Sequence, residues 1–588
     1  MLVVAFLCIV SRLVYVQVFE ANGYGTLAGQ ELTQRVSVPA HRGTLYDRDG
    51  AVLAMSEPTS NVVADDFQVT HPASEALELA PLLGVPAARL DPLLSERSGY
   101  VVLARNLSQS KAAAVSARNA AGITMIDSSV RVTPDGNLAS PVVGSVHSSG
   151  TGASGLEYQF NKELAGTAGS ETLLESPGGV ALPGTPVVDH QVARAGTGLE
   201  LTLDQQLQYT TEQDLAAQIV ATHATSGIAE VMDVRSGDIL SMANLVANAG
   251  TPKTSTSTGT SPSTSTASSG KAIAIGSKGP VSDATSNLAV TQLYEPGSVF
   301  KLVTFSAALA DGLISPNATF NVPDQVSLDG STFHDAEPHA TEDLTATQIL
   351  AQSSNIGTSE IANGLGEQRL LTQVSNLGFG RATGLDFPGE APGLLATAAN
   401  WEPTDYVSLA IGQVDAVTPQ QVLDAYNAVA NGGVMVQPRL VQATVANGHS
   451  TPVATKPGHR VIPASTDQEL TSMLGQVVEK GTGTSAFIPG YTVAGKTGTA
   501  QIPTNGGTGY VPGAYMATFV GMAPATHPVL AAIIVLNRPT PIFGGTVSAP
   551  VFSQIMGYAL HRYDIPTTPG AATTPPPSGT VASTGTAT

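Results

Sequence analysis

The chain begins with an almost continuous run of apolar residues. Its length is about that of a helix that crosses a bilayer, and Arg12 is the only charge within MLVVAFLCIVSRLVYVQVF. A cleaved signal peptide is the alternative. However, no Ala-x-Ala site follows the run, and Cys8 lacks the small residues that precede a lipid-modified cysteine. We therefore predict that residues 1–20 form a retained transmembrane anchor.

Residues 21–195 show mixed strand and helix signals without strong periodicity. Asp49-Gly50 separates the apolar pairs Leu45-Tyr46 and Val52-Leu53, a pattern that is typical of a β-hairpin. Helix signals cover further stretches at residues 74–83, 111–121 and 155–166. We predict a non-catalytic domain of mixed strands and helices over residues 21–195.

From Leu199 onward the patterns become clearer. A helix is predicted over residues 205–221, and Ser236-Gly237 lies between two alternating strands, as in a hairpin. Further on, the pattern indicates three strands and a closing helix, at residues 492–500, 516–522, 529–536 and 551–563. We predict a large domain over residues 196–565.

Two stretches have too few apolar residues to offset their ordering entropy. Residues 249–280 are dominated by Ser, Thr and Gly, and we predict a disordered surface loop inserted in the large domain. A flexible linker between two domains is the alternative interpretation. Residues 566–588 are uncharged and rich in Thr, Pro and Gly, so we predict a disordered tail.

Charge and cysteine content exclude several classes of protein. The formal net charge of −20 would repel nucleic acid, so we expect no nucleic-acid partner. Charged residues make up only 12% of the 588-residue chain, which suits an exported protein. Cys8 is the single cysteine, so an internal disulfide and a thiolate metal cluster are both excluded.

Ser298 is the candidate nucleophile. Pro296-Gly297 breaks the chain just before an apolar helical stretch, and Lys301 lies one turn after Ser298 on the same face. Amide groups at a helix start favour a developing oxyanion. A lysine in an apolar site loses its proton more easily, and as a free amine Lys301 could take the hydroxyl proton of Ser298.

The pattern Ser-x-x-Lys has little specificity by itself. It also occurs at Ser108 to Lys111, before an ordinary surface helix, and at Ser268 to Lys271, in the low-complexity stretch. The match at Ser298 alone combines a chain breaker, a helix start and an apolar helix body.

Two more polar segments could contribute to the same site. Ser353-Ser354-Asn355 follows the helical stretch ATQILAQ and can present a hydroxyl and an amide from a loop, although a polar turn or helix cap would look alike. Lys496-Thr497-Gly498-Thr499 lies on a predicted strand, where Gly498 allows a close approach of the backbone. A lysine and two hydroxyls on that strand would suit a substrate carboxylate.

Alternatives to this chemistry are weaker. GYTVAGKT formally matches a phosphate-binding loop, but such a loop needs a helix directly after it, and Pro503 and nearby glycines break the following sequence. His334, Asp335 and His339 could be drawn as a metal cluster, but their spacing matches no standard site, so we expect no metal and no cofactor. Trp401, Gly412 and Gln413 are expected beside the cleft, without a chemical role.

The order Ser-x-x-Lys, Ser-x-Asn, Lys-Thr-Gly is the motif set of penicillin-binding proteins and β-lactamases. The chain resembles a class B, monofunctional penicillin-binding protein over nearly its whole length. RGTLYDRDG and Gly155-Leu156-Glu157 resemble the non-catalytic pedestal of that family. YEPGSVFK, AIGQVDAVTPQQ, NGGVMVQP and AGKTGTAQ resemble its transpeptidase domain. The resemblance implies an α/β (α+β) fold with an antiparallel sheet flanked by helices, after an extended mixed pedestal and one transmembrane helix.

The resemblance also implies a role for each motif residue. Ser298 would attack the D-Ala-D-Ala carbonyl with Lys301 as base, while Ser353 relays a proton to the leaving amine and Asn355 orients Lys301. Lys496 would support the relay. The terminal carboxylate would be held by Thr497, Gly498 and Thr499. Backbone N–H groups of Ser298 and Thr499 are expected to form the oxyanion hole, and β-lactams are expected to acylate Ser298.

The implied function is cross-linking of peptidoglycan stem peptides, in the septal branch more than in the elongation branch. The implied partners are a membrane glycosyltransferase of the shape, elongation, division and sporulation (SEDS) family and other division proteins. The catalytic domain would lie outside the cell membrane. A D,D-carboxypeptidase or a β-lactam-hydrolysing protein would use the same residues with water as acceptor, and a β-lactam sensor or scaffold is an alternative of another class.

Overall fold

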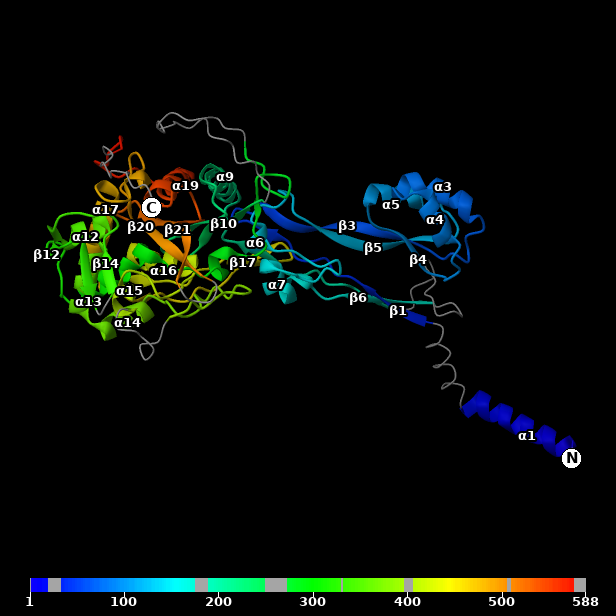
Figure 1. Ribbon diagram of the computed structural model, residues 1–588. Helices are drawn as coiled ribbons and strands as arrows, with labels where there is room; N and C mark the ends of the chain where they lie inside the picture. The colour runs from blue at the N-terminus through cyan, green and yellow to red at the C-terminus, as the bar shows by residue number, and fades with distance from the viewer. Residues whose placement is uncertain are drawn as a thin grey trace.

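The chain has an elongated N-terminal part and a compact C-terminal part (Figure 1). The computed structural model describes residues 2–19, 33–174, 189–248, 272–328, 331–395, 405–504 and 509–575. Helix α1 (Leu2–Val14), continued by the π-helical turn Tyr15–Phe19, lies at the end far from the compact part (Figure 1). Among the described residues we find no helix that combines the length and the apolar character needed to cross a membrane.

The elongated part is built around β3 (Val52–Ala64), which pairs with β2 (Leu45–Tyr46), β4 (Val101–Ser108) and β5 (Ile123–Val132). The predicted hairpin at Asp49-Gly50 is the β2–β3 connection. The outer end of these strands is covered by three helices, α3 (Pro72–Leu83), α4 (Ala87–Leu94) and α5 (Gln109–Ser116) (Figure 1). A separate ribbon consists of β1 (Thr33–Val38), β6 (Gly169–Leu174) and β7 (Asp189–Gln191).

One sheet connects the two parts. Strand β2 pairs in parallel with β8 (Gly198–Leu201), and β8 pairs with β17 (Val441–Ala446), which continues to β18 (His449–Pro452). Short helices line this junction: α6 (Ser140–Val143), α7 (Gly155–Gln159) and α8 (Asn161–Ala165).

An antiparallel sheet of six strands forms the centre of the compact part, in the order β11-β10-β9-β22-β21-β20. The strands are β9 (Ser226–Asp233), β10 (Ile239–Ala247), β11 (Val281–Asp283), β20 (Ala494–Pro503), β21 (Tyr510–Ala523) and β22 (Leu530–Asn537). The predicted hairpin at Ser236-Gly237 joins β9 and β10. Strand β20 is an edge strand, which leaves its outer side for other contacts.

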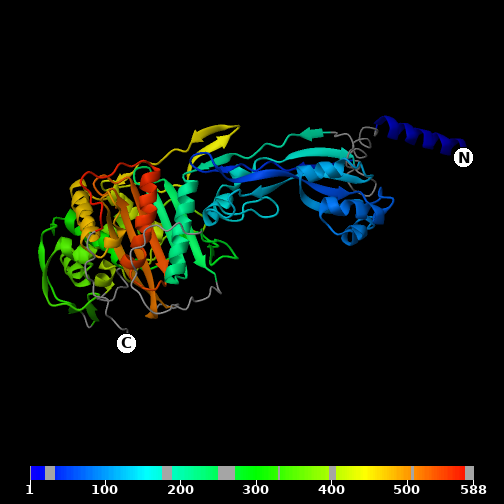
Figure 2. The ribbon, with the colours of Figure 1, turned by 90° about the horizontal axis from the view of Figure 1, so that it is seen from above.

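Both faces of this sheet are buried, because successive side chains of a strand point to opposite faces. Ala229 and Val231 contact the layer formed by α9 (Gln205–Thr222) and α19 (Ala549–Arg562), which lie side by side (Figure 2). Ile228 and Met232 pack against the opposite, larger helical layer.

The larger layer contains most helices of the compact part: α10 (Leu288–Thr291), α11 (Lys301–Ala310), α12 (Ala346–Gln352), α13 (Asn355–Leu365), α14 (Glu367–Asn376), α15 (Asp405–Ala410), α16 (Pro419–Ala430) and α17 (Ala464–Glu479). The same part of the chain also contains two-stranded ribbons: β12 (Thr319–Val322) with β15 (Glu342–Thr345), β13 (Gln325–Leu328) with β14 (Ser331–His334), and β16 (Val434–Met435) with β19 (His459–Arg460). The remaining short elements are the 3-10 turns η2 (Gly297–Phe300) and η4 (Thr484–Ala486) and the helix α18 (Gly544–Val547).

Some predicted elements differ in detail. Helix α3 begins at Pro72, before the expected start at residue 74, because proline is well suited to a first helical turn. The helix expected to reach residue 121 ends at Ser116, and the helix expected over residues 155–166 is divided at Phe160.

The expected disorder of the tail from residue 566 is wrong for its first residues. Gly490 N donates to Ala572 O at 2.9 Å, and Thr568 N donates to Gly490 O at 2.9 Å. These backbone hydrogen bonds attach residues 566–575 to the compact part. A segment that is paired in this way can be ordered even though it buries few apolar side chains. The rest of the predicted tail, and residues 249–271 of the predicted loop, lie outside the described residues.

Candidate active site

Ser298 lies in the 3-10 turn η2, directly before helix α11. Gly297 has φ +58°, a backbone conformation that suits glycine, and its N–H donates to Gly412 O at 2.8 Å. Gly412 comes so close that an added Cβ would lie 2.1 Å from Gly297 O. Ser298 itself is partly buried, and within the described part of the chain its hydroxyl makes no hydrogen bond. The contact with Gly412 therefore holds the backbone of the turn in place, while the Ser298 hydroxyl is left available for other contacts.

Lys301 is fully buried and brings the second motif to the first. Its Nζ donates to Ser353 O at 2.5 Å and to Asn355 Oδ1 at 2.8 Å, and it lies 3.3 Å from Ser353 Oγ. Burial lowers the pKa of Lys301 to about 7, against the opposing effect of the Asp335 carboxylate. A free amine is therefore well populated near neutral pH.

The geometry of Ser353 and Asn355 comes from the meeting of two helices. Ser353 ends α12 in the left-handed region at φ +64°. Ser354 is the N-cap of α13, and its Oγ accepts from Gly357 N at 2.9 Å. This sharp turn directs Ser353 O and Asn355 Oδ1 to one point, which the Lys301 ammonium group occupies.

Lys496 on β20 is the second fully buried lysine. Its Nζ donates to Thr497 O at 3.0 Å and lies 3.3 Å from Thr497 Oγ1. Burial lowers the pKa of Lys496 well below its usual value, and the charge of nearby Lys301 lowers it further. Thr497 Oγ1 also forms a 2.7 Å hydrogen bond with Thr482 Oγ1. The third motif therefore shares one electrostatic environment with the first.

Gly498 permits direct packing of η2 on β20. A Cβ at Gly498 would lie 3.0 Å from Val299 Cγ1 and 3.2 Å from Pro296 O. Thr499 Oγ1 accepts from Gly544 N at 3.3 Å, which connects the strand to α18. The predicted close approach at Gly498 is therefore present, and Ser298 lies beside the edge strand that carries Thr497 and Thr499.

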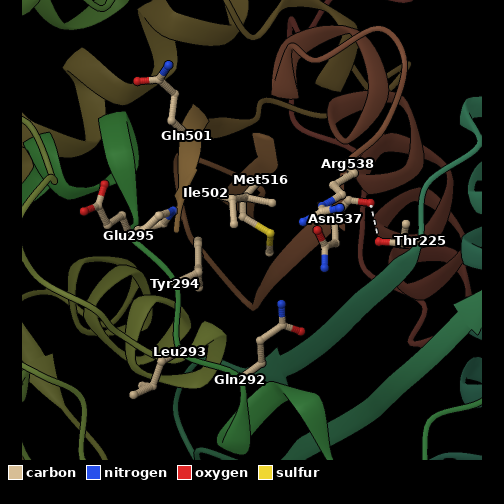
Figure 3. A pocket seen from close by; sticks show the side chains of 11 residues that line it. Thr225, Gln292, Leu293, Tyr294, Glu295, Gln501, Ile502, Met516, Asn537 and Arg538 are labelled. Carbon is tan, nitrogen blue, oxygen red and sulfur yellow. Dashed lines mark hydrogen bonds between the residues drawn. The ribbon is translucent and has the colours of Figure 1, made fainter. Parts of the chain in front are cut away.

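A cavity of about 320 Å³ is lined by residues that flank the first and third motifs in the sequence, and by others from β21 and β22 (Figure 3). Its walls include Tyr294 and Glu295, just before the turn that carries Ser298, and Gln501, shortly after Thr499. Arg538 and Asn537 contribute from the end of β22 (Figure 3). The Glu295 carboxylate accepts from Tyr510 OH at 3.0 Å, and burial raises the pKa of Glu295. Sequence reasoning did not identify this cavity, since its walls come from separate strands.

The structure also bears on two alternatives that the sequence raised, a phosphate-binding loop and a metal cluster. Residues 494–503 form a strand, so the helix that a phosphate-binding loop requires does not follow GYTVAGKT. Within the described ranges, no three His, Cys, Asp or Glu side chains are grouped to hold a metal ion. Asp335 contacts the Ser353-Ser354-Asn355 segment instead. Gly412 supports the turn that carries Ser298, and Trp401 lies outside the described residues.

Comparison with known proteins shows the family of this chain. Residues 227–557 match the penicillin binding protein transpeptidase domain, and residues 37–201 match the penicillin-binding protein dimerisation domain. The chain belongs to the class B penicillin-binding proteins. The predicted family and the predicted serine-type transpeptidase activity in peptidoglycan synthesis are confirmed by these matches.

Relatives match this penicillin-binding protein along most of their length. Penicillin-binding protein PbpB of Mycobacterium tuberculosis is 31% identical, over 97% of this chain and 84% of the relative. Peptidoglycan D,D-transpeptidase FtsI of Escherichia coli is 29% identical, over 91% of this chain and 86% of the relative. The crystal structure of penicillin binding protein 3 from M. tuberculosis with aztreonam has a TM-score of 0.68 at 28% identity, covering 92% of this chain and 99% of the other. The mixed α/β transpeptidase fold is thereby confirmed.

Proposed function

We propose that this penicillin-binding protein cross-links peptidoglycan stem peptides through an acyl-enzyme on Ser298. The observation that carries the proposal is the fully buried Lys301 amine, held by Ser353 and Asn355 one helical turn from Ser298. Near neutral pH this amine accepts the proton of the Ser298 hydroxyl while Oγ attacks the carbonyl of D-Ala-D-Ala. The C–N bond then breaks, and D-alanine leaves with a proton relayed through Ser353.

The second half-reaction uses the same groups in reverse. An amine from a neighbouring stem peptide attacks the acyl-enzyme, its proton passes to the Lys301 amine, and the Ser298 oxygen recovers a proton as the new peptide bond forms. Thr497, Gly498 and Thr499 hold the terminal carboxylate of the donor, and Lys496 supports the proton relay. The free edge of β20 supports this assignment, because an extended peptide can lie along an unpaired strand.

Substitution of the nucleophile tests the proposal. Incubation with penicillin is expected to give a covalent adduct that intact-mass analysis detects and that peptide mapping places on residue 298. Ser298→Ala is expected to give no adduct, since the variant lacks the hydroxyl that would form the bond to the penicillin carbonyl carbon. Ser108→Ala is the matched control, because Ser108 begins another Ser-x-x-Lys sequence but lies at an exposed position, and its adduct is expected to be normal.

Two results would contradict the proposal. An adduct on any residue other than Ser298 would assign the chemistry elsewhere. Rapid release of hydrolysed penicillin, in place of a stable adduct, would favour a β-lactam-hydrolysing protein.

The cellular setting is also part of the proposal. Residues 1–20 anchor the chain in the cell membrane, 21–195 form the pedestal and 196–565 the transpeptidase domain, with the catalytic part outside the cell. The apolar side chains of α1 that the structure leaves exposed support an anchor, among them Val3, Phe6 and Ile9. The names of relatives such as FtsI support a role in division.

The proposed partners are a SEDS-family membrane glycosyltransferase and other division proteins. The anchor and pedestal would provide the contact surface. Affinity purification of the full chain from membranes is expected to recover such a polymerase. This partnership would be contradicted if the polymerase were consistently absent from the purified material, although the membrane extraction kept the chain folded.

A further inference from the structure

Asp335 lies between the β13–β14 ribbon and the start of helix α13. Its backbone N–H donates to Asp324 O at 2.9 Å, which closes the ribbon at its base. The side chain is only 9% exposed and points to the first turn of α13, the helix that begins with Asn355. Two distant parts of the sequence are therefore joined directly beside the Lys301 amine.

Both oxygens of the Asp335 carboxylate accept hydrogen bonds. Its Oδ1 accepts from the backbone N–H groups of Asn355 and of Ile356, the latter at 3.1 Å. Its Oδ2 accepts from Ser354 Oγ at 2.7 Å. A carboxylate presents acceptors on both oxygens, whereas a side-chain amide would direct its own N–H groups at one set of these donors. The negative charge is also favoured at a helix N-terminus.

His339 supplies the fourth donor to this carboxylate. Its Nε2 lies 3.1 Å from Asp335 Oδ2, and its Nδ1 lies 2.7 Å from Ala340 O. Both ring nitrogens therefore face acceptors, and both must carry protons for the two hydrogen bonds to exist. The bond to Ala340 O and the neighbouring carboxylates of Asp335 and Glu342 accordingly raise the pKa of His339.

The orientation of Asn355 follows from these contacts. Asp335 accepts its backbone N–H, and His334 O accepts from its Nδ2 at 3.1 Å. The remaining polar atom, Oδ1, is turned toward Lys301 Nζ at 2.8 Å. The amide of Asn355 cannot rotate without losing one of these bonds, so its oxygen is kept in place for the lysine.

We propose that Asp335, supported by His339, is a positioning residue that fixes Ser353 and Asn355 around the Lys301 amine. It touches no reacting atom and acts through the first turn of α13. The inference rests on the proposed function of Lys301 as the base that activates Ser298. It also assigns a role to the segment His334–His339, whose histidines and aspartate do not form a metal-ligating group in the part of the chain that the structure describes.

The charge of Asp335 gives this role a measurable signature. The Asp335 carboxylate stabilises the Lys301 ammonium and raises the pKa of Lys301 against the effect of burial. Removal of the carboxylate charge is therefore expected to lower the pH at which Lys301 becomes a base. Removal of the positive charge of His339 is expected to act in the opposite direction, because Asp335 is then uncompensated.

The test measures the second-order rate of acylation of the full chain by a fluorescent penicillin, over a range of pH. Asp335→Asn is expected to slow acylation by about tenfold or more, since small displacements of catalytic groups cost that much. It should also move the midpoint of the pH profile downward. His339→Gln, which keeps an N–H donor but removes the charge, should slow acylation less and move the midpoint upward.

Glu337→Gln is the matched control, because it removes an exposed carboxylate of the same segment. Its rate and midpoint are expected to equal those of the wild type. A wild-type rate for Asp335→Asn, or slower acylation with an unmoved midpoint, would overturn the proposal and leave Asp335 a purely structural cap. If Asp335→Asn fails to fold, an unmoved midpoint for His339→Gln overturns it equally. A wild type that is not acylated at all would instead refute the proposed function.

Discussion

Lys301 and Lys496 are both fully buried, and the charge of Lys301 contributes to the lowered pKa of Lys496. Two ammonium groups in a site that excludes water repel each other and lose hydration, so the free amine forms are favoured. The Asp335 carboxylate opposes this effect at Lys301 but does not cancel it, and the pKa of Lys301 stays at about 7. The pKa of Lys301 therefore lies near physiological pH. At this pH the side chain changes from a protonated hydrogen-bond donor to a free amine that can accept a proton.

The pH profile of acylation follows from this value. As the proposed base, Lys301 can accept a proton only when its amine is free, so the rate of acylation by penicillin is expected to rise as the pH increases through about 7 and to level off above it. Stopped-flow fluorescence with a labelled penicillin measures this profile. A midpoint near 10.5, the ordinary value for a lysine, would contradict a desolvated amine.

At the scale of elements, the junction of the elongated part depends on Glu157 of α7. Its carboxylate lies 2.5 Å from Arg42 Nε, just before β2, and 2.7 Å from Arg131 Nε of β5. The side chains of Glu157, Arg42 and Arg131 are 1%, 6% and 8% exposed. A strand, a helix and the segment before a hairpin are thus held by one carboxylate.

Neutralising this carboxylate is expected to be costly. Glu157→Gln leaves two buried guanidinium groups without a counter-charge and is expected to lower the free energy of unfolding by roughly 3 kcal/mol. Thermal and denaturant unfolding of the full chain, followed by circular dichroism, measures the loss. Glu163→Gln removes an exposed charge from the next helix and should leave stability unchanged, and equal stability of the two variants would contradict this account.

At the scale of the whole molecule, the β2–β3 turn contacts the last helix. Arg562 Nη2 lies 2.8 Å from Asp49 Oδ2, and the Arg48 guanidinium lies 5.2 Å from the centre of the Tyr563 ring. Tyr563 OH donates to Asp204 Oδ2 at 3.0 Å, at the start of α9. Together with the continuous β2–β8–β17 pairing, these contacts fix the orientation of the elongated part relative to the transpeptidase part.

Local signals in the sequence predicted much of this molecule. The Ser298 turn, the Asp49-Gly50 hairpin and the strand containing Lys496 depend on neighbouring residues, so pattern and turn chemistry were sufficient. The contacts of Asp335 could not be predicted, because they depend on a ribbon folding back onto α13. Likewise, nothing in the sequence around Glu157 indicates that Arg42, 115 positions away, is its partner.

The ordered start of the C-terminal tail has a practical consequence. Thr568 Oγ1 accepts from Thr492 N at 3.2 Å, and Tyr491 OH donates to Ile565 O at 2.7 Å, immediately before the strand that carries Lys496. Purification tags and reporter fusions at this end therefore belong after residue 575. Trimming the chain closer to α19 would remove hydrogen bonds that hold the residues directly before β20 in place.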